Sequence, residues 1–296
     1  MTRDVHDLAR RRTGLSWLFA MGPKYDVRVH DLKSPRWTLD PITIAYLSDL
    51  HPMRPWVTNE SYSHHVEEVN SWGLDMIVLG GDFTSAGRTP GFKEPPEETA
   101  KVLSGLEAPL GVHAVLGNHD WIDDELAPEV DFQTSRMSQA LTEVGYHPLL
   151  NGSRRLTHHG QDFWLVGFDS QWAPRRIEEG QKKKHATKGR HDPEAAYAEV
   201  PPGAPSILLA HEPDYFVEGD PRSVLQISGH THAGQANFFG WRPFTPSAYP
   251  TRYSHGHVEE LGRHLVVSAG CGYTHVPARI AAPPEITVIR LSHPES

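Results

Sequence analysis

A short apolar run that ends in polar residues recurs five times along this chain. The first run, from Ile42 to Leu47, continues into Ser48-Asp49-Leu50-His51, where a carboxylate and an imidazole stand two residues apart. Because open α/β sheets place their sites at the carboxyl ends of strands, the repetition predicts a layered sheet protein with one polar edge. The other four runs are 76–79 before Gly80-Gly81-Asp82, 112–116 before Gly117-Asn118-His119-Asp120, 207–210 before His211, and 224–227 before Gly229-His230-Thr231-His232.

The segments between these runs indicate helices in the first half of the chain and strands in the second. The expected helices are 61–72, 96–106 and 138–144, and the further expected strands are 25–32, 163–168, 265–268 and 285–291. Alternation of strands and helices favours an α/β layered fold. The strand-rich second half suggests a second sheet, so we expect a β-sandwich with helices outside. The sequence shows no internal repeat or clear linker, so we expect a single domain.

Composition excludes several classes of protein. The chain has 296 residues, of which 38% are hydrophobic and 22% charged, values typical of a globular protein rather than a disordered or membrane-embedded one. A net charge of −9 argues against a nucleic-acid coat protein, although bound divalent cations would still admit an anionic substrate. The single cysteine, Cys271, rules out an internal disulfide and fits a reducing compartment.

Residues 1–23 join three arginines, Arg10-Arg11-Arg12, to an apolar cluster that ends at Met21. A twin-arginine export signal, an interfacial amphipathic segment and an ordinary packed helix are the alternatives. The apolar part is short and lacks a small-residue cleavage site, so we favour the packed helix. No stretch approaches the ~20 apolar residues of a membrane-spanning helix.

Two later loops stand apart. The segment 172–203 carries seven basic residues against two glutamates within 175–190. A solvated surface loop is the simpler interpretation, and a basic lid that meets an anionic substrate or a membrane surface is the alternative. The second loop is rich in aromatic residues, which we expect to pack it onto the body rather than to wall a substrate. They are Phe238, Phe239, Trp241, Phe244, Tyr249 and Tyr253.

Seven strand-end residues are of types that bind metal ions. Any one of them has an ordinary structural explanation, such as a turn or a satisfied core histidine. Together they are costly to bury unless something satisfies them. Three oxygen ligands and four imidazoles are too many for one tetrahedral zinc and suit two ions that share a carboxylate. The seven are Asp49, His51, Asp82, Asn118, His211, His230 and His232.

These motifs, in their order and at their strand ends, resemble those of the calcineurin-like metallophosphoesterases over residues 42–232. The resemblance implies an α/β fold of four-layer type, a β-sandwich flanked by helices. It also implies two divalent metal ions, from among Mn, Fe, Zn and Co, and a phosphoester substrate. On this basis 1–40 is an N-terminal segment with a lead-in strand, and 41–296 is one metallophosphoesterase domain with the basic loop 172–203.

The resemblance also assigns roles to residues. The first metal would be held by Asp49, His51 and His232, and the second by Asn118, His211 and His230, with Asp82 bridging them. His119 would face the substrate phosphate as a catalytic residue. Asp120 is the candidate nearest in sequence to orient His119, with a structural role as its alternative.

The tail carries a narrower resemblance, to a bacterial branch of membrane-associated phosphodiesterases that includes the UDP-2,3-diacylglucosamine pyrophosphohydrolases. The blocks concerned are Gly234-Gln235, Gly270-Cys271-Gly272, Pro277-Ala278-Arg279 and Pro283-Pro284-Glu285-Ile286. The phosphoprotein phosphatases carry an Asp where Ser85 stands and a basic residue where Ala86 stands, with Arg88 displaced by two. This departure argues against protein phosphatase activity.

We therefore expect a dinuclear-metal-dependent hydrolase of a phosphodiester or pyrophosphate, by in-line attack of water activated between the ions. A nuclease or cyclic-nucleotide phosphodiesterase on the same site is the alternative. A non-catalytic, metal-stabilised scaffold is the alternative of another class, although a scaffold does not need His119. We expect a cytoplasmic protein without a stable nucleic-acid partner. Peripheral contact with the inner membrane, which would give access to a lipid-linked phosphoester, is one hypothesis, and a soluble enzyme acting on a soluble phosphoester is the alternative.

Overall fold

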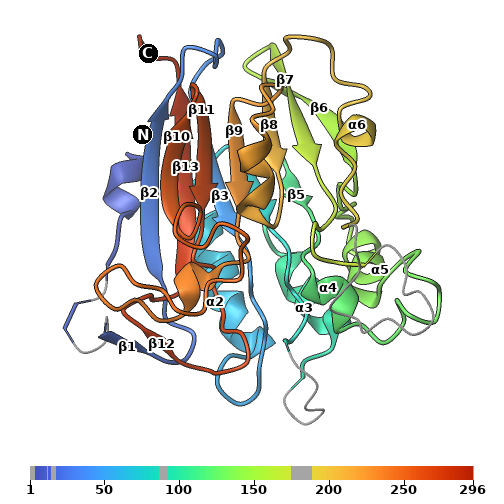
Figure 1. The fold of residues 1–296 in the computed structure, drawn as a ribbon, viewed down its shortest axis with the longest axis vertical. Coiled ribbons are helices and arrows are strands. Elements are labelled where there is room, and N and C mark those ends of the chain that lie inside the picture. The colour runs from blue at the N-terminus through green and yellow to red at the C-terminus, as the bar shows by residue number, and fades with distance from the viewer. Residues whose placement is uncertain (1–3, 12, 15–17, 87–92, 175–188, 296) are drawn as a thin grey trace.

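Two mixed sheets packed face to face form the body of the protein (Figure 1). The computed structural model describes residues 4–295 except 12, 15–17, 87–92 and 175–188. The first sheet has the order β2 (Asp26–Lys33), β13 (Glu285–Ser292), β3 (Ile42–Leu47), β4 (Met76–Leu79), β5 (Val112–Ala114). The second has the order β10 (Gly256–Glu260), β11 (Arg263–Val267), β9 (Leu225–Ser228), β8 (Ser206–Leu209), β7 (Gln161–Gly167), β6 (Gly152–His158).

Strand direction brings the polar loops to one end of the sandwich. Strands β3, β4 and β5 are parallel neighbours in the first sheet, and β7, β8, β9 and β11 are parallel neighbours in the second. The carboxyl ends of parallel strands lie at the same edge of a sheet, so their following loops meet. A hydrogen bond from the backbone of His230, after β9, to the side chain of Asp49, after β3, joins the two sheets at this edge.

Alternation along β3 explains why the sheets pack as they do. Ile42, Ile44 and Tyr46 face the second sheet and pack against residues such as Phe163 and Ile207. Successive side chains of a strand point to opposite faces. The intervening Ala45 and Leu47 accordingly belong to the other core cluster, which residues of the helices complete.

Helices cover the outer faces of both sheets. Those on the side of the first sheet are α2 (Asn59–Asn70), α3 (Pro96–Leu103), α4 (His119–Ile122) and α5 (Arg136–Glu143). The short α6 (Pro193–Ala196) and the 3₁₀ helix η3 (Pro213–Glu218) lie on the side of the second sheet. This arrangement confirms the expected α/β sandwich with flanking helices.

Two edge strands were missed from the sequence. Both β6 and β10 are outermost in the second sheet, and their side chains are mostly polar and partly exposed. An edge strand with one solvated face lacks the apolar run by which buried strands are recognised. The remaining short elements are the 3₁₀ helices η1 (Val5–Leu8) and η4 (His232–Gly234) and a separate pair of strands, β1 (Phe19–Ala20) and β12 (Arg279–Ile280).

The N-terminal helix that we favoured stays a prediction, because residues 1–3, 12 and 15–17 lie outside the described residues. Phe19 lies in a strand, and the side chains of Leu18, Phe19 and Met21 are exposed by 37%, 59% and 58%. Residues 175–188 of the basic loop, which hold six of its seven basic residues, and also Arg88 lie outside the described residues. Arg190 is no free surface charge, since it pairs with Asp169 at 2.6 Å and covers the ring of Trp121. No helix among the described residues is long and apolar enough to cross a bilayer.

Candidate active site

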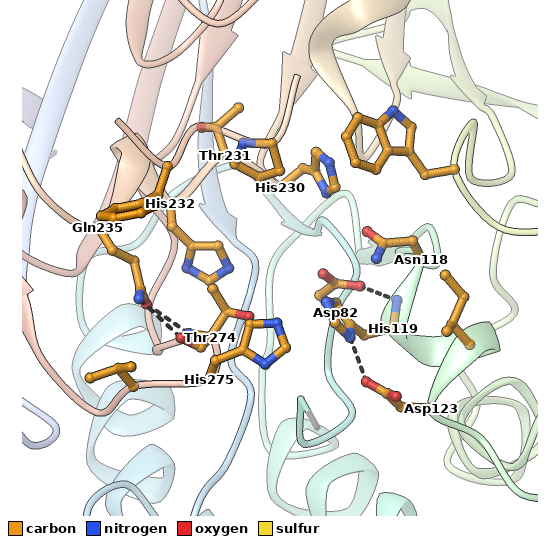
Figure 2. A pocket seen from close by; sticks show the side chains of 15 residues that line it. Asp82, Asn118, His119, Asp123, His230, Thr231, His232, Gln235, Thr274 and His275 are labelled. Carbon is orange, nitrogen blue, oxygen red and sulfur yellow. Dashed lines mark hydrogen bonds and ion pairs between the residues drawn. The ribbon is translucent and has the colours of Figure 1, made fainter. Parts of the chain in front are cut away.

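The seven candidate metal ligands come together in the loops at the shared edge of the sheets. Asp49 and His51 follow β3, Asp82 follows β4, and Asn118 follows β5. From the second sheet, His211 follows β8, and His230 and His232 follow β9. Every one of the seven is buried, Asn118 the most exposed at 6%. Figure 2 shows Asp82, Asn118, His230 and His232 around one cavity.

The backbone at this edge adopts conformations that side chains other than glycine rarely take. Asp49, His51, Asp82, His230 and His232 have φ angles of 53°, 39°, 56°, 68° and 51°. Left-handed conformations in such residues carry a strain of order 1–3 kcal/mol each and cluster at functional sites. Five of the seven candidate ligands therefore lie in loops with backbone conformations that their residue types alone would not favour.

Glycine allows the loops to approach the carboxylates closely. A Cβ atom on Gly117 would collide with the side chain of Asp82, and one on Gly229 would collide with that of Asp49. The Gly-Asn-His and Gly-His-x-His motifs thus need their glycines to let neighbouring loops close around the carboxylates.

Contacts sort the ligands into two adjacent groups. Ligand atoms of Asp49, His51 and His232 lie within 4.8 Å of one another, and so do those of Asp82, His211 and His230. Between the groups, Nε2 of His51 lies 3.4 Å from Oδ2 of Asp82, and Nε2 of His211 lies 3.1 Å from the same oxygen. Asp82 therefore lies where the two groups meet.

Several of these atoms are buried without a hydrogen-bond partner among the described residues: Nε2 of His51, His211 and His230, and Oδ1 of Asn118. Nδ1 of His51 lies 2.9 Å from the carbonyl of Thr84, and Nδ1 of His211 lies 2.7 Å from that of Gly80. Because a carbonyl can only accept, both Nδ1 atoms donate, and in the neutral imidazole each Nε2 atom then keeps a lone pair. Unsatisfied lone pairs of this kind are costly to bury and are what a metal ion requires, so the residues present fit bound cations.

Closely packed charges shift the pKa values of the cluster in both directions. Burial acts to lower the pKa of His211, but the charges of Asp82 and Asp49 outweigh it and raise that pKa well above its ordinary value. Burial raises the pKa of Asp49, an effect to which the neighbouring Asp82 charge adds. Burial also acts to raise the pKa of Asp82, but the facing imidazoles, chiefly His211, hold it well below its usual range. Burial lowers the pKa of His230 and His232, which favours the neutral imidazole that ligates metals.

His119 stands beside this cluster, held from two sides. Its backbone N–H donates to Oδ1 of Asp82 at 2.8 Å, and its Nδ1 lies 2.6 Å from Oδ2 of Asp123 (Figure 2). Burial acts to lower the pKa of His119, but the charges of Asp82 and Asp123 outweigh it and raise that pKa above its ordinary value. Asp123 was missed from the sequence, although its position four residues after His119 is the spacing of one helical turn.

Asp120 does not contact the His119 ring through any described hydrogen bond. Its Oδ1 accepts from the backbone N–H of Phe83 and Thr84, and its Oδ2 from those of Asp82 and Gly117, at 2.8–3.0 Å. These contacts correspond to the structural role that the sequence left as the alternative. Asp120 holds together the loops after β4 and β5, which carry the candidate ligands Asp82 and Asn118.

A cavity of about 1060 Å³ opens above the cluster. Asp82, Asn118 and His119 form part of its lining, together with His230 and His232. The remaining lining includes apolar and aromatic side chains that the sequence did not assign to a site: Ile122, Trp172, Phe244, His275 and Val276. The expected packing of the aromatic loop holds for Tyr253, which is fully buried, and is wrong for the five other aromatic residues, which are exposed: Phe238, Phe239, Trp241, Phe244 and Tyr249.

Comparison with known proteins agrees with this geometry. Residues 42–234 match the calcineurin-like phosphoesterase family model. The chain is 28% identical over 254 residues to the uncharacterised Bacillus subtilis metallophosphoesterase YkuE, covering 85% of this chain and 79% of that protein. It is 27% identical over 277 residues to a bovine transmembrane protein with a metallophosphoesterase domain, covering 90% of this chain but 56% of that protein.

Two further similarities are more distant or partial. An uncharacterised Helicobacter pylori metallophosphoesterase is 28% identical over 255 residues, and the chain spans 60% of its length. Among solved structures, Haemophilus influenzae NAD nucleotidase aligns with a TM-score of 0.47 at 12% identity, over 78% of this chain and 45% of that one. The family match covers more than half of the chain and includes all seven clustered candidate ligands. The chain is a metal-dependent phosphoesterase and belongs to the calcineurin-like phosphoesterase family.

Proposed function

We propose that this protein hydrolyses a phosphodiester or pyrophosphate bond with two divalent metal ions, from among Mn, Fe, Zn and Co. The observation that carries the proposal is the set of buried ligand atoms without a hydrogen-bond partner on His51, Asn118, His211 and His230. Asp49, His51 and His232 would hold one ion, and Asn118, His211 and His230 the other, with Asp82 shared. Two such ions lower the pKa of a water molecule and neutralise charge on the phosphoryl group.

The residues of the chain then position the substrate and move a proton. Asp123 accepts from Nδ1 of His119 and so fixes the imidazole with its Nε2 free to face the phosphate. The Asp123 carboxylate favours the protonated imidazole of His119, whose Nε2 can give its proton to the leaving oxygen. Asp120 keeps the loops that carry Asp82 and Asn118 in register.

The cavity supports a substrate with a bulky group on each side of the phosphorus. A phosphate monoester would occupy only the floor, where the metal ligands lie. The walls formed by Trp172, Phe244 and Val276 offer apolar surface to a second substituent. Trp172 also lies edge-on to His230, with ring centroids 4.6 Å apart, so this wall begins at the metal ligands.

An exposed apolar rim beside this cavity supports a lipid-linked substrate. Phe19 of β1 is paired with Ile280 of β12, which also forms a bridge with Ala236 at the start of the aromatic loop. The N-terminal strand and the aromatic loop therefore flank the same strand. We define the apolar rim as the exposed side chains of this region: Phe19, Met21, Phe238, Phe239, Trp241 and Phe244.

Exposed Phe and Trp side chains gathered beside a site are typical of contact with a membrane interface. Phe244 belongs both to the rim and to the cavity lining, so the two surfaces are continuous. A substrate could then keep its acyl chains near the rim while its phosphate reaches the metals. We place the protein on the cytoplasmic side of the inner membrane, in peripheral contact with it. A soluble cyclic nucleotide or a nucleic acid would have no use for the rim.

The metal chemistry is tested with bis-p-nitrophenyl phosphate and added Mn²⁺. Asp82→Asn is expected to lose metal and activity together, and Asn118→Ala to lose mainly one metal. Asp7→Asn, at an exposed carboxylate on η1, serves as the matched control and keeps both. Two metals and undiminished turnover in Asp82→Asn would contradict the shared-carboxylate assignment.

The rim is tested by sedimentation with anionic and neutral vesicles at low and high salt. The full chain, a chain lacking residues 1–22, and a Phe239→Ser/Trp241→Ser variant are compared. Both altered proteins are expected to bind more weakly than the full chain. Leu261→Ser is the control, because Leu261 is 90% exposed on the β10–β11 turn, outside the rim. Equal recovery in the supernatant throughout would contradict membrane contact while leaving the hydrolytic chemistry untouched.

A further inference from the structure

A second cluster of metal-binding side chains lies on the hairpin formed by β10 and β11. Glu259 pairs directly with His264 across the hairpin, and His257 pairs with Val266. Residues two apart on a strand point to the same face, so His257 and Glu259 share a face of β10. Because Glu259 and His264 are direct partners, His264 lies on that same face of β11. The hairpin therefore presents two imidazoles and one carboxylate together.

The ligand atoms of the three residues lie close enough together to bind one ion. Nε2 of His257 lies 2.9 Å from Nδ1 of His264, and one ligand atom from each of the three residues lies within 4.8 Å of the others. With metal–nitrogen bonds of about 2.0–2.1 Å, two ligands of a tetrahedral ion stand roughly 3.3 Å apart. A small increase in the distance between the two ring nitrogens would be enough to admit the ion.

The chemistry of the three groups suits a borderline metal such as zinc. Two imidazole nitrogens and one carboxylate oxygen are ligands that Zn²⁺ prefers, and that Mg²⁺ or Ca²⁺ would not select. His264 is almost fully buried, which fixes one ligand, while the exposed His257 and Glu259 leave the ion a path of entry. Burial lowers the pKa of both His257 and His264, so both imidazoles are neutral, as ligands must be, at neutral pH.

A third imidazole adjoins the pair from the other sheet. His30 lies on β2, the edge strand of the first sheet, and its ring centroid lies 6.4 Å from that of His257. Nε2 of His30 is buried without a hydrogen-bond partner among the described residues. Nε2 of His30, near the edge where β2 and β10 approach each other, is therefore a further nitrogen atom that could bind an ion.

This cluster is distinct from the active site. Strand β11 runs parallel to β9, and His264 pairs with Leu225, at the amino end of β9. The active-site ligands His230 and His232 follow the carboxyl end of β9. The two clusters accordingly lie at opposite ends of the same parallel strands.

We propose that His257, Glu259 and His264 form an additional binding site for Zn²⁺ or a similar borderline divalent ion. An ion held there ties β10, an outermost strand, to β11 and stabilises the folded state, because a ligand that binds only the folded state shifts unfolding by mass action. The site takes no part in hydrolysis, and its loss leaves turnover unchanged.

The test counts zinc by elemental analysis after equilibrium dialysis of the whole protein at neutral pH. The variants His257→Gln and Glu259→Gln change exposed side chains and should fold normally. Each is expected to bind one zinc fewer per chain than the unaltered protein, with unchanged hydrolysis of bis-p-nitrophenyl phosphate. His64→Gln, at an exposed histidine of α2 outside the cluster, is the matched control and keeps the full count.

Two further measurements separate this site from the catalytic metals. Zinc added to Asp82→Asn, in which the active site is impaired, is expected to raise the thermal midpoint, and the additional His257→Gln change is expected to abolish that rise. Cobalt should give the visible absorption of a tetrahedral site in Asp82→Asn but not in the double variant. Equal zinc counts in His257→Gln and the unaltered protein, or an unchanged thermal response, would overturn the proposal.

Discussion

Nδ1 of His119 lies 2.6 Å from Oδ2 of Asp123, one helical turn further along the chain. Asp123 caps the carboxyl end of α4, the short helix that begins at His119 itself. A carboxylate can only accept here, so the imidazole must carry its proton on Nδ1 whenever it is neutral. The contact thereby sets both the orientation of the ring and the nitrogen that faces the cavity (Figure 2).

Asp123→Asn is expected to lower kcat by about ten-fold or more while both metals stay bound, since the imidazole loses its orienting charge. The measurement is turnover of bis-p-nitrophenyl phosphate with metal content determined in parallel. In a His119→Ala background the same change should cost nothing further, because the group that it positions is gone. An equal loss of kcat in both backgrounds would show that Asp123 does not act through His119.

His119→Ala is expected to keep both metals and to lower kcat by about 10²-fold or more, the size expected for a missing general acid. The loss should be larger for substrates with poor leaving groups than for nitrophenolate, which needs little protonation. Comparison of a nitrophenyl and an alkyl diester measures this difference. Equal losses on the two diesters would point to charge stabilisation instead, and unchanged turnover would remove His119 from the mechanism.

Asp120→Asn is expected to destabilise the fold by about 2–4 kcal/mol, because an amide presents one acceptor oxygen where the carboxylate has two. At least two of the backbone N–H groups that Asp120 now satisfies would then face an N–H₂ group. Urea unfolding of the metal-free protein measures the change. Asp162→Asn, at an exposed carboxylate of β7, is the control. Normal stability with impaired kcat would instead place Asp120 in the catalytic chemistry.

Stability should also fall in acid because of His65, which lies buried on α2 and stacks on Tyr25. Burial lowers the pKa of His65 to about 4, partly offset by its hydrogen bond to the carbonyl of Ser61. The unfolded chain, with a histidine pKa of about 6.5, binds the proton first as pH falls. The contribution of His65 to the free energy of unfolding is therefore complete above pH 6.5. It is lost as pH falls towards 4, by about 3 kcal/mol in all.

His65→Phe keeps the stacked ring but cannot titrate. The free energy of unfolding of the variant, relative to that of the unaltered protein, should therefore increase as pH falls from 7 to 4. Chemical denaturation at several pH values measures the difference between the two proteins, and the metal ligands, common to both, cancel. The matched change at the exposed His64 should produce no such trend. A pH-independent difference for His65→Phe would contradict this origin of acid sensitivity.

The sequence by itself determined the strands that carry the candidate ligands and the ligand types at their ends. Both are local properties: the apolar run of a buried strand and the loop that follows it stand together in the chain. For β3, the sequence placed the strand at its observed position and Asp49 and His51 directly beyond it. Strands with a solvated face, such as β6 and β10, carry no comparable pattern and were missed.

Only the tertiary structure decided which residues meet across the fold. Asp123 contacts His119 because a helix begins at His119, whereas Asp120 points back to the loops after β4 and β5. The exposure of Phe239 and Trp241 depends on whether another element covers them, which no local pattern states. His257, Glu259 and His264 become one cluster only through the register of β10 against β11, since pairing between strands is set by the whole sheet.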